Sequence, residues 1–242
     1  MGRWRQTDGE PSVAEGVGYG MIQARLISVQ VGAVQTHGAY DAANPLDKRW
    51  TTGFFKAPTR GPVVVRWLGL AGDEQADPRF HGGRDKAVLA YSADHFPEWK
   101  KDPDLGALSG GGFGENLTVA GQTEADVCVG DAWRIGDVLL EVTQPRQPCW
   151  KLGRRWRRPD LPKQVIAQGW TGWYFRVLEE GTVEAGLTLT LERRVHPAWT
   201  IAEANCVMYD KRATAARLRE LTSLPELSQA WKDELGERAA GR

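Results

Sequence analysis

The chain has 242 residues, enough for one large domain or for one domain with an appendage. Hydrophobic residues make up 41% and charged residues 26% of the chain, as in ordinary globular proteins with a sizeable core. Lys and Arg together number 31, and so do Asp and Glu, so no overall field recruits nucleic acid or an anionic membrane.

The first 20 residues are rich in glycine and charge, and we expect a poorly ordered extension there. This stretch lacks the apolar core of a secretory signal, and no apolar run is long enough to span a membrane. The three cysteines, Cys128, Cys149 and Cys206, lie far apart in the chain. An odd cysteine count without a secretion signal argues against a disulfide framework and indicates a cytoplasmic protein.

Residues 21–197 contain short apolar runs bounded by Gly, Pro, Asp or Asn, a pattern typical of a β-barrel or a sandwich. One helix is expected to interrupt them, from the N-cap Ser92 to Lys101, because Phe96 and Trp99 recur at helical spacing. The strand-like runs occupy residues 22–31, 63–68, 87–91, 116–119, 138–143 and 187–192.

Residues 198–242 show helical patterns instead, and we expect a small three-helix appendage there. Thr200 is the predicted N-cap of a helix over residues 201–209. Two further helices are predicted over residues 213–222 and 227–240, separated by a Ser-Leu-Pro sequence.

Residues 72–86, GDEQADPRFHGGRDK, form a predicted loop because they carry many Asp, Gly and Arg residues and no periodic apolar pattern. The two glycines after His81 allow the backbone to approach a ligand while His81 and Arg84 point at it. A solvated turn with local Asp–Arg pairs is the alternative interpretation.

Residues 144–152, QPRQPCWKL, directly follow one of the strand-like runs. Their prolines stop the strand, and the second one places Cys149 near the start of a helical turn. There the helix dipole, Arg146 and Lys151 favour the thiolate, the form that binds soft metals. A buried and inert cysteine is the alternative interpretation.

Four other features carry weaker signals. Asn116, in the sequence GENLT, offers an amide to a polar ligand or caps a turn. The RRWRR sequence over residues 154–158 is either a solvated basic turn or an anion patch, and the aromatic residues 170–175 favour core and rim positions. Cys128 and Cys206 lie in apolar patterns, which predicts core packing for both.

Taken together, these motifs resemble the MOSC family, the domain also found at the C-terminus of molybdenum cofactor sulfurases. The resemblance rests on GDEQAD, FHGG and DKAV, then FGENL, and then VGDAWRIG followed by LLEVTQPRQPCWKL. The order of the motifs and the three-helix tail are similar to the stand-alone bacterial YiiM-like branch. The resemblance implies a mainly β protein: a MOSC-type β-barrel with a few helices over residues 21–197, and a three-helix domain over 198–242.

The resemblance also implies a site that holds a molybdenum–pterin cofactor (molybdopterin). Cys149 would ligate the metal, His81 would deliver a proton because its ordinary pKa lies near neutrality, and Arg84 would orient substrate oxygen or hold phosphate. The remaining cofactor-binding residues implied are Arg146, Asn116 and Lys151.

Related molybdenum proteins reduce N-hydroxylated compounds such as hydroxylamines, hydroxylaminopurines and amidoximes, so the resemblance implies such a substrate. Three cysteines cannot hold a Cys₄ iron–sulfur cluster, and no flavin or nicotinamide fingerprint is present. A separate flavin or iron–sulfur reductase is therefore the expected electron donor. Neither nucleic acid nor a membrane is an expected partner.

Three alternatives stay open at this point. Cys149 could carry a persulfide or pass on cofactor without turnover, or it could act with His81 in a metal-free thiol enzyme. The tail could be a docking module, because it carries the charged residues Lys211, Arg212, Arg217 and Arg219, or it could simply cover an apolar face of the barrel.

Overall fold

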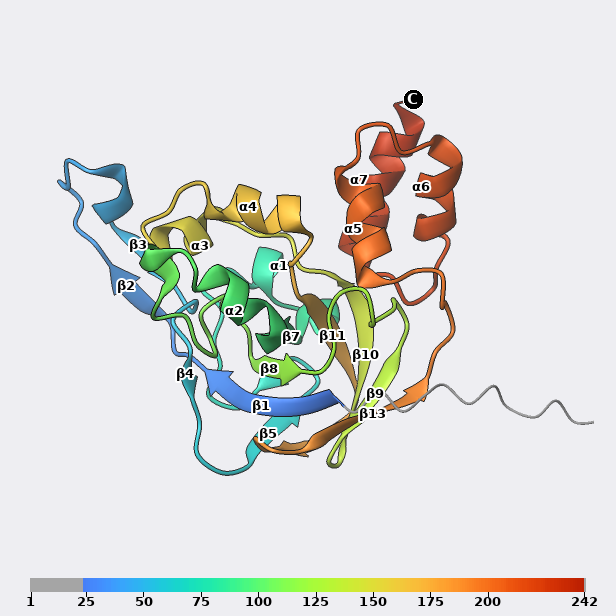
Figure 1. The fold of residues 1–242 in the computed structure, drawn as a ribbon, viewed down its shortest axis with the longest axis horizontal. Helices are drawn as coiled ribbons and strands as arrows, with labels where there is room; N and C mark the ends of the chain where they lie inside the picture. Colours follow the sequence, from blue (N-terminus) through green and yellow to red (C-terminus); the bar gives the residue numbers. More distant parts are fainter. Residues whose placement is uncertain (1–23, 242) are drawn as a thin grey trace, which may run out of the picture.

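Seven strands close into a β-barrel in the computed structural model, which describes residues 24–241 (Figure 1). Around the barrel the order is β13, β9, β10, β11, β7, β8 and β1, and β1 pairs again with β13. Only the pair of β7 and β8 is parallel among these neighbours. The strands are β1 (Ala24–Val31), β7 (Val88–Ser92), β8 (Leu117–Ala120), β9 (Ala132–Ile135), β10 (Val138–Pro145), β11 (Trp173–Glu179) and β13 (Thr188–Arg193). The predicted barrel is confirmed, whereas the extension expected over residues 1–20 lies outside the described residues.

Shorter strands decorate the barrel. A three-stranded sheet lies beside it, a two-stranded hairpin projects from it, and β4 extends the edge of β1. The sheet contains β12 (Gly181–Val183), β5 (Val63–Arg66) and β6 (Gly69–Leu70), the hairpin contains β2 (Gln35–His37) and β3 (Trp50–Thr52), and β4 spans Ala57–Pro58.

The helices form two groups on different sides of the barrel (Figure 1). The first group contains α2 (Phe96–Trp99), α3 (Trp150–Arg155) and α4 (Leu161–Gln168), and the second contains α5 (Ile201–Tyr209), α6 (Ala215–Thr222) and α7 (Gln229–Ala240). The short helix α1 (Pro78–His81) and the 3₁₀ turn η2 (Arg84–Lys86) lie in the loop before β7.

The helix expected from Ser92 to Lys101 is divided into a 3₁₀ turn, η3 (Ala93–His95), and α2. Ser92 does cap this segment, since its side chain accepts a hydrogen bond from the backbone N–H of Asp94 at 3.2 Å. The helix ends at Trp99, and Lys100 is its C-cap.

The alternation of apolar residues explains how the strands fill the barrel. Along β1, the side chains of Ala24 and Leu26 are completely buried, whereas Arg25 and Ile27, which alternate with them, are exposed. β10 is buried on both faces because its outer face is covered by α5 of the tail. Trp133, Trp173 and Phe175 are the largest fully buried side chains that the barrel strands contribute to this core.

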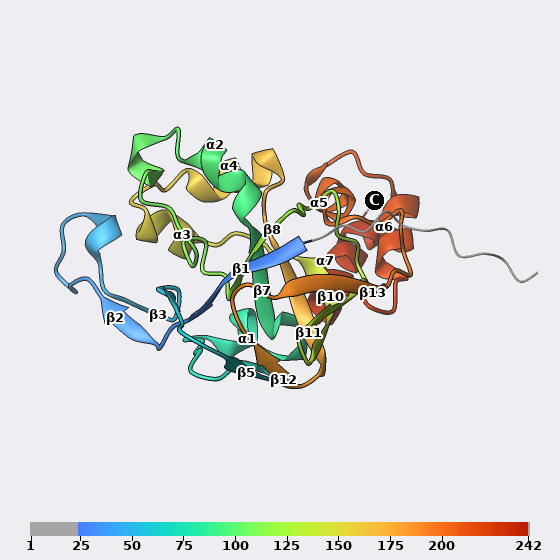
Figure 2. The same cartoon turned by 60° about the horizontal axis from the view of Figure 1, so that its bottom comes forward.

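The three helices of the tail lie together beside β10 and β13 (Figure 2), and their buried side chains belong to the same core cluster as those of the barrel. The predicted N-cap Thr200 is confirmed, and Thr214 and Ser228 cap the other two helices in the same way: each side chain accepts a hydrogen bond from a backbone N–H group in the first turn. Trp231 and Leu235 of α7 are fully buried within this core. The tail therefore covers an apolar face of the barrel.

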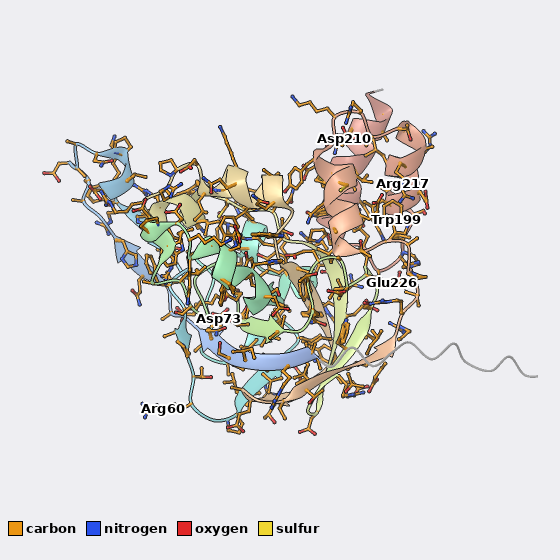
Figure 3. The ribbon with its side chains drawn as sticks, in the orientation of Figure 1. Arg60, Asp73, Trp199, Asp210, Arg217 and Glu226 are labelled. Atoms are coloured by element: carbon orange, nitrogen blue, oxygen red, sulfur yellow. The ribbon has the colours of Figure 1, made fainter. Side chains whose placement is uncertain are left out.

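The charged residues considered for docking are partly neutralised inside the tail. Arg217 lies over the ring of Trp199, 3.9 Å from its centroid, and also pairs with Glu203 at 2.8 Å (Figure 3). Arg212 pairs with Asp210 at 3.3 Å. A docking role for the tail stays a prediction, with less free charge to support it.

The cysteine predictions are half right. Cys128 is buried, and burial raises the pKa of its thiol to about 11. The prediction for Cys206 is wrong, because this side chain is exposed. The buried face of α5 is formed by Ile201, Ala204, Val207 and Met208 together with Asn205, which places residue 206 on the opposite face.

None of the helices within residues 24–241 is long and apolar enough to cross a membrane.

Candidate functional site

A pocket forms where the loop before β7 meets the segment after β10. It brings together five of the six residues that the sequence had singled out: His81, Asn116, Arg146, Cys149 and Lys151. The other lining residues come from β3 and the β3–β4 connection, residues 74–76, η2, β7, the glycine-rich loop (residues 110–114), the segment after β10, and β11. They are Thr52, Gly53, Phe54, Lys56, Glu74, Gln75, Ala76, Lys86, Leu89, Phe113, Gly114, Gln147 and Tyr174.

Cys149 stands at the N-cap position of α3, as the two prolines before it predict. β10 ends at Pro145, and the backbone at Cys149 is extended before the helix begins at Trp150. The thiol is half-buried and makes no hydrogen bond within the described chain. It is therefore available to a ligand that enters the pocket.

Arg146 supplies a buried cation with spare hydrogen-bonding capacity. Its Nη2 donates to the carbonyl oxygen of Phe113 at 3.1 Å, whereas its buried Nη1 has no partner in residues 24–241. Lys151 likewise has no hydrogen bond or ion pair within that range. By contrast, Lys56 at the other end of the pocket is bound to Asp73 at 2.5 Å.

The backbone after His81 depends on glycine. A side chain at residue 82 would lie 3.0 Å from the carbonyl oxygen of Pro78, and residue 83 has a φ of 90°, which favours glycine. These two glycines end α1 at His81 and leave its imidazole in the pocket.

The pKa of His81 is lowered to about 4, mainly because the imidazole is desolvated by burial and further because Lys151, Lys86 and Arg146 surround it with positive charge. The imidazole is therefore uncharged at neutral pH. A proton-delivering role for His81 stays a prediction, and at this pKa it requires a bound group that raises the pKa again. The three cations contribute to this shift in the same direction as burial.

Tyr174 is a pocket residue that the sequence placed only among rim and core aromatics. Burial raises the pKa of its hydroxyl to about 12, so the group keeps its proton at neutral pH. This hydroxyl has no hydrogen-bond partner among the described residues. Only its neighbours in space mark it out, because nothing in the GWTGWYF sequence separates it from its aromatic neighbours.

Two of the predicted site residues, Arg84 and Asn116, make contacts within the protein instead of offering a free group to the pocket. Arg84 does not line the pocket: it is exposed, and its guanidinium lies 4.9 Å from the ring centroid of Trp67. Asn116 lines the pocket, but its amide accepts from the N–H of Leu89 at 3.1 Å and donates to the carbonyl of Gln30 at 3.3 Å. Its main task is to fasten the barrel strands that form the pocket wall.

Glu115 shapes the glycine-rich side of the pocket. Its fully buried carboxylate accepts hydrogen bonds from the N–H groups of Gly111 and Phe113 at 2.7 and 2.9 Å. It thereby fixes the loop whose Phe113 carbonyl receives Arg146. Desolvation raises the pKa of this carboxyl.

The described residues contain no cluster of three or more His, Cys, Asp and Glu side chains that could hold a metal ion. A metal in this pocket would have to bring most of its own ligands and take one thiolate from the protein. A pterin cofactor with a phosphate group meets this condition, and Arg146 and Lys151 fit its negative charge. The residues present therefore fit a molybdenum–pterin group.

Comparison with known proteins places the chain in a family. A family model described as "MOSC domain" matches residues 77–190, and one described as "YiiM-like, 3-alpha helix domain" matches residues 199–242. The chain is 39% identical over 207 residues to the Bacillus subtilis protein YflK, covering 86% of this chain and 90% of that protein. The chain belongs to the MOSC family.

Two further likenesses refine this membership. The crystal structure of YiiM from Geobacillus stearothermophilus superimposes with a TM-score of 0.73 at 35% identity, covering 89% of this chain and 99% of that one. A protein from Gibberella moniliformis named "Reductase" is 37% identical over 178 residues, which are 72% of this chain and 32% of that protein. The fold and the tail are thus those of a YiiM-like MOSC protein.

Proposed function

We propose that this MOSC protein reduces N-hydroxylated compounds with a molybdenum–pterin cofactor held by Cys149. The observation that carries the proposal is the pocket itself: one free thiol stands beside a buried arginine with an unpartnered Nη1 and beside an unpaired lysine. The name of the Gibberella relative supports a reductase activity.

The residues of this chain would divide the binding work as follows. The thiolate of Cys149 would take one coordination position of the metal, and Arg146 and Lys151 would bind the anionic part of the cofactor. Lys86, whose Nζ donates to the carbonyl of Phe80 at 3.0 Å, would add positive charge at the rim. When bound, the cofactor supplies a metal centre that accepts an oxygen atom and provides two electrons.

Reduction of an N–OH group to N–H consumes two electrons and two protons and releases water. The Tyr174 hydroxyl retains its proton and can donate a hydrogen bond to the substrate oxygen. The neutral imidazole of His81 can accept a hydrogen bond, and an anion bound beside it would raise its pKa and so make it a proton carrier. Electrons would come from a separate flavin or iron–sulfur reductase.

The proposal is tested by the metal content of protein that is purified gently from a host able to make the cofactor. We expect about one molybdenum per chain, together with pterin fluorescence, and reduction of a hydroxylamine with an artificial electron donor. Cys149→Ser should abolish metal retention because a hydroxyl cannot replace a soft thiolate ligand. Folding of the variant is checked by its melting temperature.

Cys128→Ser is the matched control, because this buried thiol lies outside the pocket and should keep the metal. Full molybdenum occupancy in Cys149→Ser would refute the ligand assignment. A metal-free protein with persulfide sulfur on Cys149 would favour a sulfur carrier instead.

A further inference from the structure

The N-terminal end of α7 makes hydrogen bonds to β10, just before the segment that carries Cys149, and to η2, in the loop that carries His81. The N–H of Ser228 donates to the carbonyl of Thr143 at 3.1 Å, and the N–H of Gln229 donates to Oδ2 of Asp85 at 3.3 Å. Thr143 precedes the segment that ends at Cys149, and its hydroxyl donates to the carbonyl of Asp85 at 2.6 Å. The start of α7 is therefore joined at one point to residues 146–149 (the Cys149 segment) and to residues 78–87 (the His81 loop).

The loop that leads into α7 strengthens this junction. Arg176 of β11 binds Asp85 at 2.6 Å and also donates to the backbone carbonyl of Glu226 at 3.4 Å. Glu226 lies where the tail meets the barrel (Figure 3). Barrel, tail and η2 are thus connected through a single guanidinium.

Farther along α7, Glu234 reaches the pocket rim. Its carboxylate accepts a hydrogen bond from Nε2 of Gln147 at 2.9 Å, and Gln147 lines the pocket close to Cys149. The negative charge of Glu234 also acts on Lys86, another lining residue, whose pKa it raises against the opposing and larger effect of burial.

The Cys149 segment has few restraints of its own. The N–H of Arg146 donates to Gly172, and the carbonyl of Cys149 accepts from Leu152. Between these two points the backbone makes no hydrogen bond to residues 24–241. The side chain of Arg146 holds the start of this segment through the carbonyl of Phe113. Within residues 147–149 the contact of Gln147 with Glu234 is the only side-chain hydrogen bond to the described residues, so α7 supplies the polar side-chain restraint nearest to the thiol.

We infer that α7 is a positioning element of the pocket, in which Glu234 and the helix start hold the Cys149 segment in place against the His81 loop. The tail is then part of the site rather than a separate module. This inference rests on the proposed function only in taking the pocket as a cofactor site, because the position of the thiol can be measured without cofactor.

The test is the rate at which a disulfide reagent modifies Cys149 in the full-length, cofactor-free protein. A Cys206→Ser background removes the exposed thiol of α5, and Cys128 is buried. We expect Glu234→Ala to raise the rate about 2- to 10-fold, the change that the loss of one ordinary hydrogen bond produces. Because Glu234 is exposed, the melting temperature should stay nearly unchanged.

Two control variants show whether a change in the rate comes from loss of the contact with Gln147, from loss of negative charge, or from a general effect on α7. Glu237→Ala removes the same charge from the same helix, where the side chain has no hydrogen bond or ion pair in the described chain, and should leave the rate unchanged. Glu234→Gln keeps a group that can accept from Gln147 and should restore the wild-type rate. Equal rates in Glu234→Ala and Glu237→Ala, or no rescue by Glu234→Gln, would overturn the inference.

A second arm uses protein loaded with cofactor. Glu234→Ala should speed molybdenum loss by a similar factor, and adding Gln147→Ala should bring no further change, because both substitutions remove one contact. Additive effects of the two would contradict a shared tether. If no variant binds molybdenum, the proposed function fails, while the thiol rates still decide the role of α7.

Discussion

Two basic segments of this chain are neighbours in sequence, but the cations of one lack partners in the protein and most cations of the other are already bound. The first, residues 146–151, places Arg146 and Lys151 in the pocket, where Nη1 of Arg146 and the Lys151 ammonium have no partner within residues 24–241. The second, residues 154–158, contains four arginines, and three of them are bound to acceptors of the protein itself.

The partners of the second segment are distributed over distant parts of the chain. Arg154 donates to the carbonyl oxygens of Pro45 and Lys48 at 2.5 and 2.6 Å. Arg157 pairs with Asp47, and Arg158 pairs with Asp102 and Asp160. The fourth, Arg155, lies over the ring of Phe55, 4.6 Å from its centroid.

The comparison teaches that a cluster of positive charge in a sequence does not mark an anion site. What distinguishes the two segments is whether acceptors elsewhere in the fold already satisfy the cations. The pKa of His81 is lowered first by burial and further by the cations of the first segment, whereas the hydrogen bond and charge of Arg157 lower the pKa of Asp47. Residues 154–158, considered as an anion patch, therefore mainly bind other parts of the protein, and we call their contacts with residues 45–48, 102 and 160 the arginine clamp.

Replacing Arg146 should have the largest effect. A hydrogen bond to a charged group contributes about 1.5–3 kcal/mol, so we expect Arg146→Gln to bind cofactor about 10- to 100-fold more weakly. Cofactor release measured by pterin fluorescence checks this. The matched change Arg157→Gln should leave the release rate as it is, and equal losses in both variants would remove the distinction between the segments.

Removing one unpaired charge should produce a smaller, electrostatic effect. Lys151→Gln should raise the pKa of His81 from about 4 toward its ordinary value, but only in part, because burial is the larger cause of the shift. An NMR titration of the His81 ring measures the change. An unaltered pKa would mean that Lys151 contributes nothing to the field.

The same shift has a consequence for stability. Because the folded pKa of His81 lies below its unfolded value of about 6.5, the unfolded chain takes up the proton first as the pH falls. His81 therefore lowers the free energy of unfolding progressively from about pH 6.5 to about pH 4. Denaturant titrations at several pH values should show a shallower decline in Lys151→Gln than in wild type.

The smallest effect on stability and cofactor binding is expected when an arginine of this arginine clamp is replaced. Arg157 and Asp47 are both exposed, and such pairs contribute little. Arg157→Gln should leave the melting temperature and the cofactor content unchanged within error. A marked loss of cofactor would show that the second segment belongs to the binding site after all.

Much of the local structure could be predicted from the sequence. The apolar runs located five of the seven barrel strands but missed β9 and β11, and the run over residues 63–68 became β5 of the side sheet. Thr200 marked the start of α5, and the prolines around Arg146 placed Cys149 before a helix. These features depend on residues that are close together in the chain. The helix from Ser92 to Lys101 was less accurate, because the chain forms a 3₁₀ turn before α2.

The sequence by itself thus determined most of the barrel strands, the caps Ser92 and Thr200 and the position of Cys149 before a helix, since backbone preferences and short-range periodicity set them. Only the tertiary structure decided which polar groups were already satisfied. In the folded chain the amide of Asn116 is already hydrogen-bonded to Leu89, and the guanidinium of Arg84 lies over the ring of Trp67. Tyr174 lines the pocket, and Glu234 accepts a hydrogen bond from Gln147. These four placements result from contacts and burial between residues far apart in the chain, and no local sequence pattern encodes them.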